Sequence, residues 1–377
     1  MKQAKAQAYI RQLCCLGLGK GAVMPELLRA LHAVIPSEDN LFIGVDEKPF
    51  PTSIIPEHVV PEALDVYMNA QAQIAMPGFY IQLGQWFSTH RVLPDFRILN
   101  EQFYRSDFYH LVLRPYKHYH ILQGGIRLNG LPVGTLNLCR PQHQRPFSAD
   151  DQQQFERLLS YVEHGMQTRS GTDGEYADSG QAGMVILKRC GTVVYLSDSA
   201  RTLLLLATYG ALPVGQVRFA HEIVLPPALR QICHNLDQIF QGREAPPPIC
   251  SHTNPSGRFV FRAYWLQPPA VSARLPDIPV HTPPDDALIG VMIEHQEPLR
   301  LKLHRNLQGG RLSVREQEVG LALAEGLSHI AIAARLHIGP QTVVTYVRRV
   351  YEKLGVHSRE ELLKKLLLLE PNVTRKI

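Results

Sequence analysis

Hydrophobic and polar positions over the first 168 residues follow both helical and strand periodicity. Helices are predicted at residues 26–34 and 148–167, and strands at residues 120–128 and 131–139. The later helix begins at Ser148 and Asp151, a pair that can bond each other's backbone N–H groups. Asn129 and Gly130 favour a tight hairpin turn between the strands. Because tight turns join neighbouring strands, residues 1–168 predict an α+β domain with antiparallel pairing.

Residues 183–298 show the same mixture and form a second predicted α+β domain. Strands are expected at residues 184–187 and 193–196 around Gly191, a helix from Ser199, and a hairpin of residues 258–266 and 287–295. The hairpin loop, residues 267–286, is long and rich in proline. Between the two domains, residues 167–182 offer almost nothing to bury, which favours a linker or a mobile loop.

The pattern is most regular from Arg311 onward, where it predicts four short helices. Ser313 with Glu316, and later Ser358 with Glu361, have the S-x-x-E spacing of a capping box. Each box marks the start of a helix, because its two side chains satisfy backbone N–H groups that have no partner within the helix.

The second and third of these helices are separated only by the turn at residues 337–340, which ends in a proline suited to a first helical position. Two short helices joined by such a turn inside a compact helical unit form a helix-turn-helix. We therefore predict an all-α, four-helix helix-turn-helix domain over residues 305–377.

The outward face of the predicted third helix carries side chains suited to the DNA major groove. Arginine can bond guanine in two places, glutamine can pair with adenine, and the methyl groups of valine and threonine can contact thymine. Lysine and arginine elsewhere can contact phosphates. The predicted DNA-binding residues are Ser328, Gln341, Thr342, Val344, Thr345, Arg348, Arg349 and Lys353.

Charge is distributed unevenly along the 377 residues. The chain has 39 Lys+Arg and 34 Asp+Glu, a net charge of +5. All of this excess lies in residues 305–377, whereas the preceding residues are neutral overall. A basic end on a neutral body favours an anionic partner for that end, with nucleic acid ahead of a membrane surface.

Several other functions lack a matching pattern. No apolar run approaches the length of a membrane span, and the first residues contain no apolar segment of a secretory signal. The six cysteines have no metal-binding spacing and read as reduced thiols of a cytoplasmic protein. We expect no cofactor, no metal, no membrane partner and no catalytic residues, because no nucleophile or acid–base motif is present.

Aromatic residues are concentrated between residues 79 and 120. Such rings, with a few polar groups, can line a pocket for a small organic ligand. The alternative is that they fill the core of the first domain. The candidate ligand-binding residues are Tyr80, Trp86, Phe103, Tyr104 and Phe108.

Residues 312–362 resemble the DNA-binding domain of LuxR-type transcription regulators. The resemblance rests on LSVREQEV, LAEGLS, IAARL, Thr342-Val343 and KLGVHSREEL. It implies double-stranded DNA as a partner for the third helix, and dimer contacts through the fourth. The sequence departs from the family at Val344, where lysine is usual, and at His337, where glycine is usual.

The upstream segments carry partial resemblances to sensor domains. Residues 125–167 are similar to the closing hairpin and helix of GAF-type domains, and residues 184–204 to PAS-type domains. Together these features predict two α+β sensor-like domains followed by the helix-turn-helix domain.

The predicted protein is a homodimeric transcription regulator that binds DNA and a small-molecule ligand, with RNA polymerase as a further candidate partner. In the alternative reading the upstream domains bind no ligand and serve only dimerisation or protein contact.

Overall fold

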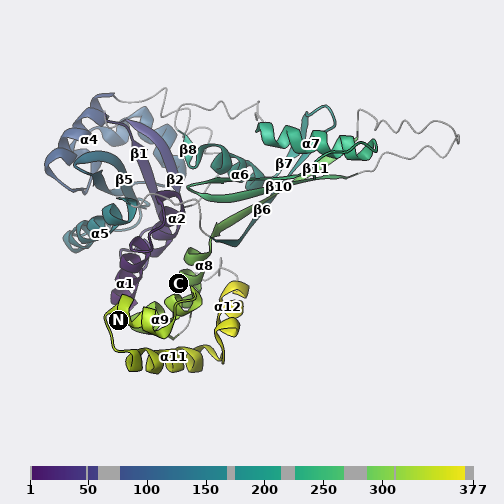
Figure 1. Cartoon of the computed structure of the whole chain (residues 1–377). Coiled ribbons are helices and arrows are strands. Elements are labelled where there is room, and N and C mark those ends of the chain that lie inside the picture. Colours follow the sequence, from purple (N-terminus) through teal and green to yellow (C-terminus); the bar gives the residue numbers. More distant parts are fainter. Residues whose placement is uncertain are drawn as a thin grey trace, which may run out of the picture.

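The computed structural model describes residues 2–47, 50–57, 77–167, 175–213, 226–266, 287–309 and 311–369. These residues form two antiparallel β-sheets with helices, followed by a helical unit (Figure 1). Among the helices described, none is both long enough and apolar enough to cross a bilayer.

The first sheet has the strand order β3-β4-β5-β1-β2-β8, with every pairing antiparallel. Its strands are β1 (Asp39–Val45), β2 (Pro51–Pro56), β3 (Val92–Leu93), β4 (His120–Leu128), β5 (Leu131–Arg140) and β8 (Leu212–Pro213). The predicted hairpin is confirmed as β4 and β5. Its turn residues Asn129 and Gly130 both have positive φ, at 53° and 82°, as a tight two-residue hairpin turn requires.

Helices cover both faces of this sheet. They are α1 (Lys2–Cys14), α2 (Lys20–Leu31), α4 (Pro77–Thr89) and α5 (Ala149–Gln167), with short helical turns at Phe96–Ile98, Phe103–Arg105, Tyr109–Leu113 and Arg114–Tyr116. The predicted start of α5 is confirmed, since Ser148 and Asp151 bond each other's backbone N–H groups. This helix approaches the sheet at Gly124, where a Cβ would collide with Phe155 and Leu159.

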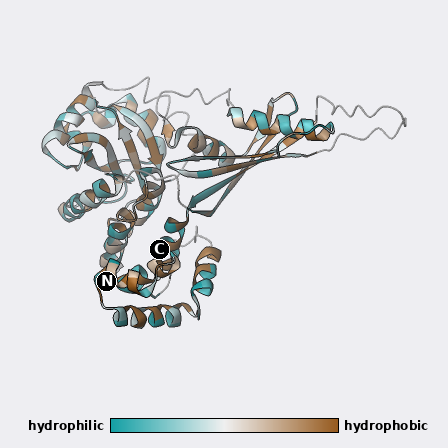
Figure 2. Ribbon diagram, in the orientation of Figure 1, coloured by the Kyte–Doolittle hydropathy of each residue, from teal (hydrophilic) through white to brown (hydrophobic). Residues whose placement is uncertain are grey.

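The second sheet has the order β7-β6-β11-β10-β9, again fully antiparallel. Its strands are β6 (Tyr176–Lys188), β7 (Val193–Leu196), β9 (Ile249–Asn254), β10 (Gly257–Trp265) and β11 (Leu288–Pro298), with helices α6 (Asp198–Tyr209) and α7 (Pro227–Phe240). Both helices pack on one face through a core that includes Val185, Phe261 and Val291. Figure 2 shows that the first part of β6 is hydrophilic, whereas α7 carries both hydrophobic and hydrophilic residues.

Two sequence-based expectations need correction. Residues 176–182, interpreted as part of a linker or mobile loop, form the first half of β6 and pair with β11. Their polar side chains are accommodated because Ser179 is buried and donates to the His295 carbonyl at 2.8 Å. In addition, β8 comes from the second segment but pairs with β2 of the first sheet, so the two predicted domains share a strand. The predicted hairpin loop 267–286 lies outside the described residues.

The last helices are α8 (Leu299–Leu307), α9 (Val314–Ala324), α10 (His329–Leu336), α11 (Pro340–Leu354) and α12 (Arg359–Leu368). The core of this unit is continuous with the helical layer on the first sheet, because one buried cluster includes Leu13 of α1, Leu307 of α8 and Val350 of α11. Helix α8 directly continues β11. The helical unit is therefore packed against the body of the protein (Figure 1).

Candidate nucleic-acid interface

The predicted capping box at the start of α9 is confirmed. The Ser313 N–H donates to the Glu316 carboxylate at 2.6 Å, and the Glu316 N–H donates to the Ser313 hydroxyl at 3.4 Å. At α12 the arrangement is only half as predicted. Ser358 accepts from the Glu361 N–H, but the Glu361 carboxylate accepts from the His357 N–H instead.

The turn between α10 and α11 fixes the angle at which the two helices meet. His337 ends α10 in the left-handed conformation, with φ of 53°. Gly339 precedes α11, and Pro340 takes its first position. At the other end of α10, the Ser328 hydroxyl accepts from the Ala331 N–H at 3.2 Å. The sequence-based expectation of a helix-turn-helix is thereby met in its local geometry.

Helix α11 has one buried face and one exposed face. Val343, Val347, Val350 and Leu354 pack inward. The predicted DNA-binding residues on this helix are all exposed: Gln341, Thr342, Val344, Thr345, Arg348, Arg349 and Lys353. Ser328 is exposed as well and begins the preceding helix. Exposure of this whole face leaves it accessible to a large partner.

The exposed cations differ in their surroundings. Arg348 forms no ion pair with any residue in the described part of the chain. The Arg349 guanidinium lies 6.0 Å from the centre of the Tyr346 ring. The Lys353 ammonium, in contrast, donates to both oxygens of Glu316, at 2.7 and 2.9 Å. The ion pair of Lys353 with Glu316 therefore joins α11 to α9, whereas the charge of Arg348 can bind an external partner.

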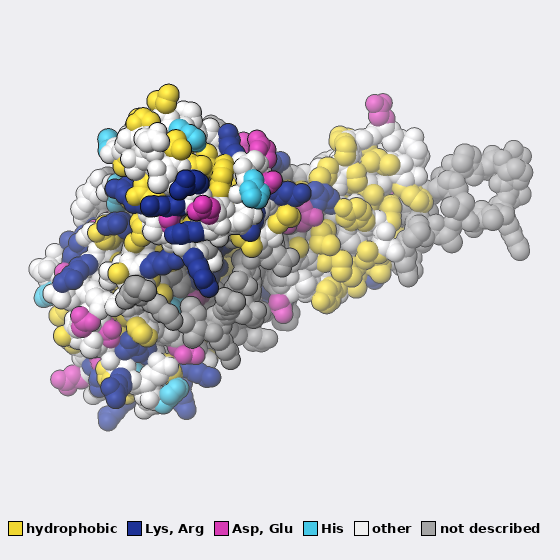
Figure 3. All heavy atoms as spheres, turned by 90° about the horizontal axis from the view of Figure 1, so that it is seen from below, with side chains coloured by type: hydrophobic (Ala, Val, Ile, Leu, Met, Phe, Trp, Pro, Cys, Tyr) yellow, Lys and Arg dark blue, Asp and Glu magenta, His cyan; other side chains and the backbone are white. Residues whose placement is uncertain are grey.

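Glu316 is the buried anion of the helical unit. Burial by itself raises the pKa of Glu316, but hydrogen bonds from Lys353 and Ser313 outweigh that effect and hold the pKa below its ordinary value. A charged Glu316 thus stabilises both the start of α9 and the position of α11. Viewed from below, Lys and Arg side chains gather on the surface of the helical unit (Figure 3).

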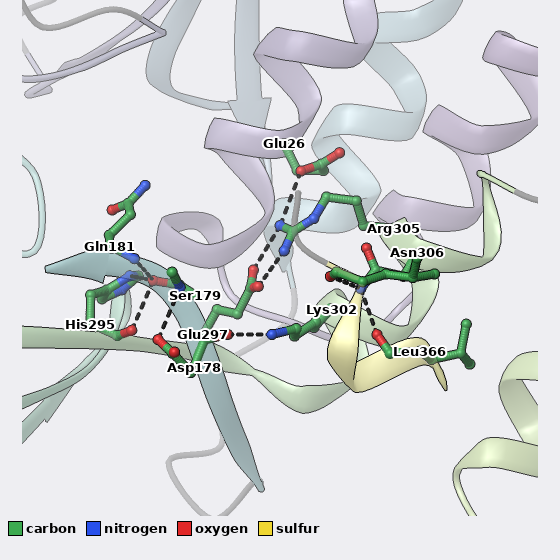
Figure 4. Close-up of polar contacts among 12 residues, drawn as sticks. Glu26, Asp178, Ser179, Gln181, His295, Glu297, Lys302, Arg305, Asn306 and Leu366 are labelled. Atoms are coloured by element: carbon green, nitrogen blue, oxygen red, sulfur yellow. Dashed lines mark hydrogen bonds and ion pairs between the residues drawn. The ribbon is translucent and has the colours of Figure 1, made fainter. Parts of the chain in front are cut away.

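A polar cluster around α8 joins the helical unit to the body. Figure 4 shows Arg305 pointing between Glu26 of α2 and Glu297 of β11. Its guanidinium donates to both Glu297 oxygens, one of them at 2.8 Å, and to Glu26 at 3.5 Å. Lys302 donates to the Asp178 carbonyl of β6 at 2.7 Å. On the opposite side, Asn306 donates to the Leu366 carbonyl of α12 at 2.6 Å. Helix α8 therefore contacts the second sheet, helix α2 of the first domain, and helix α12 of the helical unit.

Two further contacts connect the same units. Arg300 at the start of α8 bonds the Leu16 carbonyl after α1 and, at 2.5 Å, the Glu325 carboxylate after α9. Gln12 of α1 donates to Glu318 of α9 at 3.2 Å. A displacement of the first domain would therefore shift α9 through these contacts.

The aromatic segment contains core residues and cavity residues. Phe103 is fully buried. Trp86 donates its indole N–H to the Val92 carbonyl at 3.0 Å, and Tyr104 donates its hydroxyl to the Tyr119 carbonyl at 2.6 Å. Of the five candidate ligand-binding residues, Tyr80 and Phe108 line a cavity of about 40 Å³ between the sheet and α4.

Sequence reasoning missed the polar residues of this cavity. His118, Gln123 and Asn137 also line it. The Nε2 of His118 pairs with Asp39 at 2.8 Å, and the described residues contain no cluster of three or more potential metal ligands. The available signal was the presence of Gln123 and Asn137 inside otherwise apolar strands.

Comparison with known proteins places the C-terminal unit in a family. Residues 311–366 match the bacterial regulatory proteins of the luxR family, GerE. The probable transcriptional regulatory protein NarL of Mycobacterium tuberculosis is 56% identical over 48 residues, which are 13% of this chain and 22% of that protein. A putative HTH-type transcriptional regulator of Mycobacterium bovis, Mb0914c, is 45% identical over 53 residues, 14% of this chain and 6% of that protein.

Similarity to solved structures is slight. The phage VqmA–DPO complex has a TM-score of 0.18 and 15% identity, over 49% of this chain and 82% of that one. The VqmA dimer of Vibrio cholerae has a TM-score of 0.16 and 16% identity, over 49% and 81%.

The family match and the geometry coincide. The matched residues contain the capping box of α9, the left-handed residue that ends α10, and the exposed face of α11. Residues 311–366 are a helix-turn-helix DNA-binding domain of the luxR family of bacterial regulatory proteins.

Proposed function

We propose that the chain is a transcription regulator that binds double-stranded DNA as a homodimer, and that its two upstream domains control this binding in response to a small ligand. The observation that carries the proposal is the exposed face of α11 in a luxR-family domain, with Gln341, Thr345 and Arg348 on its surface. These side chains supply the donors, acceptors and methyl groups that base edges in the major groove recognise. RNA polymerase is a further partner expected of such a regulator.

Homodimerisation is supported by an apolar surface on the second sheet. Helices α6 and α7 cover one face of this sheet, and the opposite face, here called the outer face, carries Met184, Ile186, Tyr195, Tyr264, Leu266 and Met292. Tyr195 and Tyr264 are 53% and 52% exposed. Figure 3 shows hydrophobic side chains gathered over this part of the molecule. Large apolar patches of this kind mark interaction surfaces.

The occupant we propose for the outer face is a second copy of the chain. The strand register brings Met292 beside Met184, and Tyr264 beside Gly290, so the apolar side chains form one continuous patch. Arg262 and Glu294 form a half-exposed ion pair within the same face. Under two-fold symmetry each of these charges can meet its opposite on the second copy, which makes the face complementary to itself.

Control by a ligand is supported by the connections of α8. A conformational change in the first domain would move Glu26, and one in the second domain would move Glu297. Because both carboxylates bond Arg305, either change would reach α8. The competing function is a regulator without a ligand, in which the upstream domains only dimerise. The GAF-like and PAS-like character of these domains stays a prediction.

The proposal is tested with the full chain in a selection from random DNA duplexes. We expect enrichment of a two-fold symmetric sequence with half-sites about one helical turn apart, and an affinity that falls as salt rises. A chain in which Arg348, Gln341 and Thr345 are all replaced by alanine provides the control and should enrich no sequence. Absence of salt-dependent binding to every duplex would overturn the proposal.

A further inference from the structure

The cavity of the first domain contains three buried polar atoms without partners. The Tyr80 hydroxyl, the His118 Nδ1 and the Gln123 Oε1 form no hydrogen bond within the described residues. The three residues are 6%, 3% and 3% exposed. Buried polar atoms are almost always hydrogen-bonded, because leaving one unpaired costs its full desolvation energy. Three such atoms in one cavity indicate a missing partner.

The neighbours of these atoms define what each can bond. The Gln123 Nε2 donates to the Thr135 hydroxyl at 2.9 Å, so its oxygen is left to accept. His118 directs Nε2 at the Asp39 carboxylate at 2.8 Å, which places the proton of a neutral ring on Nε2 and leaves Nδ1 to accept. Burial raises the pKa of Tyr80, so its hydroxyl remains protonated and can donate.

The rest of the lining is apolar. It includes Leu41, Ile43 and Ile121 of the sheet, and Phe108 and Leu113 of the short helical turns. A charged group would lose its hydration here without an opposite charge to replace it, because Asp39 is already paired with His118. The cavity therefore favours an uncharged group that has at least one N–H or O–H donor beside an acceptor oxygen.

We infer that this cavity binds a small uncharged molecule with a primary amide, or an equivalent pairing of donor and acceptor, on a short apolar frame. Its oxygen accepts from Tyr80, and its N–H or O–H group donates to Gln123 or His118. The volume of about 40 Å³ holds roughly three groups of the size of water. This inference names the ligand class for the sensory role proposed above and rests on that role for its biological consequence.

The cavity also has a physical connection to the second domain. The buried cluster that surrounds it includes Leu205 of α6 and Leu212 of β8. Because β8 pairs with β2, and β2 pairs with β1, which carries Leu41 and Ile43, occupancy of the cavity acts on a sheet that both domains share. Ligand binding can therefore change the relation between the domains without a separate linker.

The test uses two probes of the same shape, acetamide and acetone, with the full chain. Acetone has a methyl group in place of the NH₂ group, so it cannot satisfy Gln123 and His118. We expect acetamide to bind about tenfold or more tightly in an NMR titration. Equal affinities would overturn the inference. Crystallographic density for water alone in the cavity at saturating acetamide would overturn it too.

Tyr80→Phe provides the matched variant. The Tyr80 hydroxyl has no partner in the described chain, so its removal should leave thermal stability unchanged or higher, while weakening both probes about three- to tenfold. In the control, Tyr104→Phe, the lost hydroxyl bonds the Tyr119 carbonyl and does not line the cavity, so affinity should not change. Equal affinities for the two variants would contradict the inference. No DNA is present, so this result is independent of the DNA selection.

Discussion

Arg348 is the residue on α11 whose chemistry most directly tests base recognition. It is exposed and forms no ion pair with a described residue. Arg348→Ala should weaken binding to the selected duplex by about 1–3 kcal/mol and leave binding to unrelated duplexes nearly unchanged, because a bidentate contact to guanine is lost. Fluorescence anisotropy with both duplexes measures the difference. An equal loss on both would instead make Arg348 a phosphate contact.

Val344 allows the opposite experiment, in which a contact is gained. It is 44% exposed on the same face and stands where the resembling family usually has lysine. Val344→Lys should tighten binding to all duplexes and steepen the slope of log affinity against log salt by about 0.9, since one further phosphate is neutralised. Val344→Met serves as the control of similar length without charge. The same slope for both variants would place residue 344 away from the DNA backbone.

Single residues also show how far the sequence allows prediction. The capping box of Ser313 and Glu316 could be predicted, because it depends only on two residues three positions apart in the sequence. His337 stands where the resembling family usually has glycine, and its φ of 53° is one that glycine adopts readily. The contact between Lys353 and Glu316 was not predicted, because it joins positions 37 residues apart and depends on how α9 packs on α11.

At the scale of elements, strand β6 shows why local pattern can fail. The polar residues of 176–182 lack the alternation of a typical strand, yet they pair with β11. Their pairing is determined by a partner strand more than 100 residues later, through contacts such as Ser179 with His295. The polar lining of the cavity was missed for a related reason. Gln123 and Asn137 become neighbours only when β4 pairs with β5.

Helix α8 depends on Arg305, whose loss would leave Glu297 buried without its cation and Glu26 with Arg29 as its remaining cation. Arg305→Met should lower the free energy of unfolding by about 3–5 kcal/mol at neutral pH. Chemical denaturation measures this, with Arg315→Met as the control, because the Arg315–Glu318 pair is exposed and contributes about 0–1 kcal/mol.

The pH dependence of this variant follows from Glu26. Burial raises the pKa of Glu26, but Arg29 and Arg305 outweigh that effect and hold it below the ordinary value. A lowered carboxyl pKa contributes stability that is present above the unfolded pKa and lost as pH falls through the folded pKa. The deficit of Arg305→Met should therefore shrink in acid. A deficit independent of pH would mean that packing, rather than charge, explains it.

His304 gives α8 a second response to pH. It is buried, its ring stacks on Tyr9 of α1 at 4.7 Å, and burial lowers its pKa to about 4. In the unfolded chain, His304 takes up a proton near pH 6.5, whereas in the folded chain it does so only near pH 4. The free energy of unfolding is therefore highest above pH 6.5 and falls as the pH drops towards 4. The loss amounts to about 2 kcal/mol by pH 5.

His304→Phe preserves an aromatic ring beside Tyr9 and removes the titrating group. Between pH 6.5 and pH 4, its unfolding free energy should fall less steeply than that of the unaltered chain. The exposed His357 provides the control, as His357→Gln should leave the profile unchanged. Parallel profiles for His304→Phe and the unaltered chain would show that protonation of His304 does not oppose folding.

At the scale of the whole molecule, the helix-turn-helix domain is packed against the upstream domains rather than joined to them by a free tether. One buried cluster runs from α1 and α2 through α8 to α11. The outer face of the second sheet and the exposed face of α11 are two separate surfaces of this unit. A dimer formed through the outer face would therefore set the distance between two copies of α11, and any shift at α8 would change that distance.

Met292→Asp tests this arrangement, because it places a charge beside Met184 at the centre of the outer face. Met292 is 36% exposed in the single chain, so the substitution should disturb folding little while preventing association. Analytical ultracentrifugation should show a monomer, and binding to the two-fold DNA site should lose its cooperativity. In the control, Leu131→Asp, the residue is 60% exposed on the first-domain hairpin, so the dimer should persist. A dimer that survives Met292→Asp would locate the contact elsewhere, with α12 as the next surface to test.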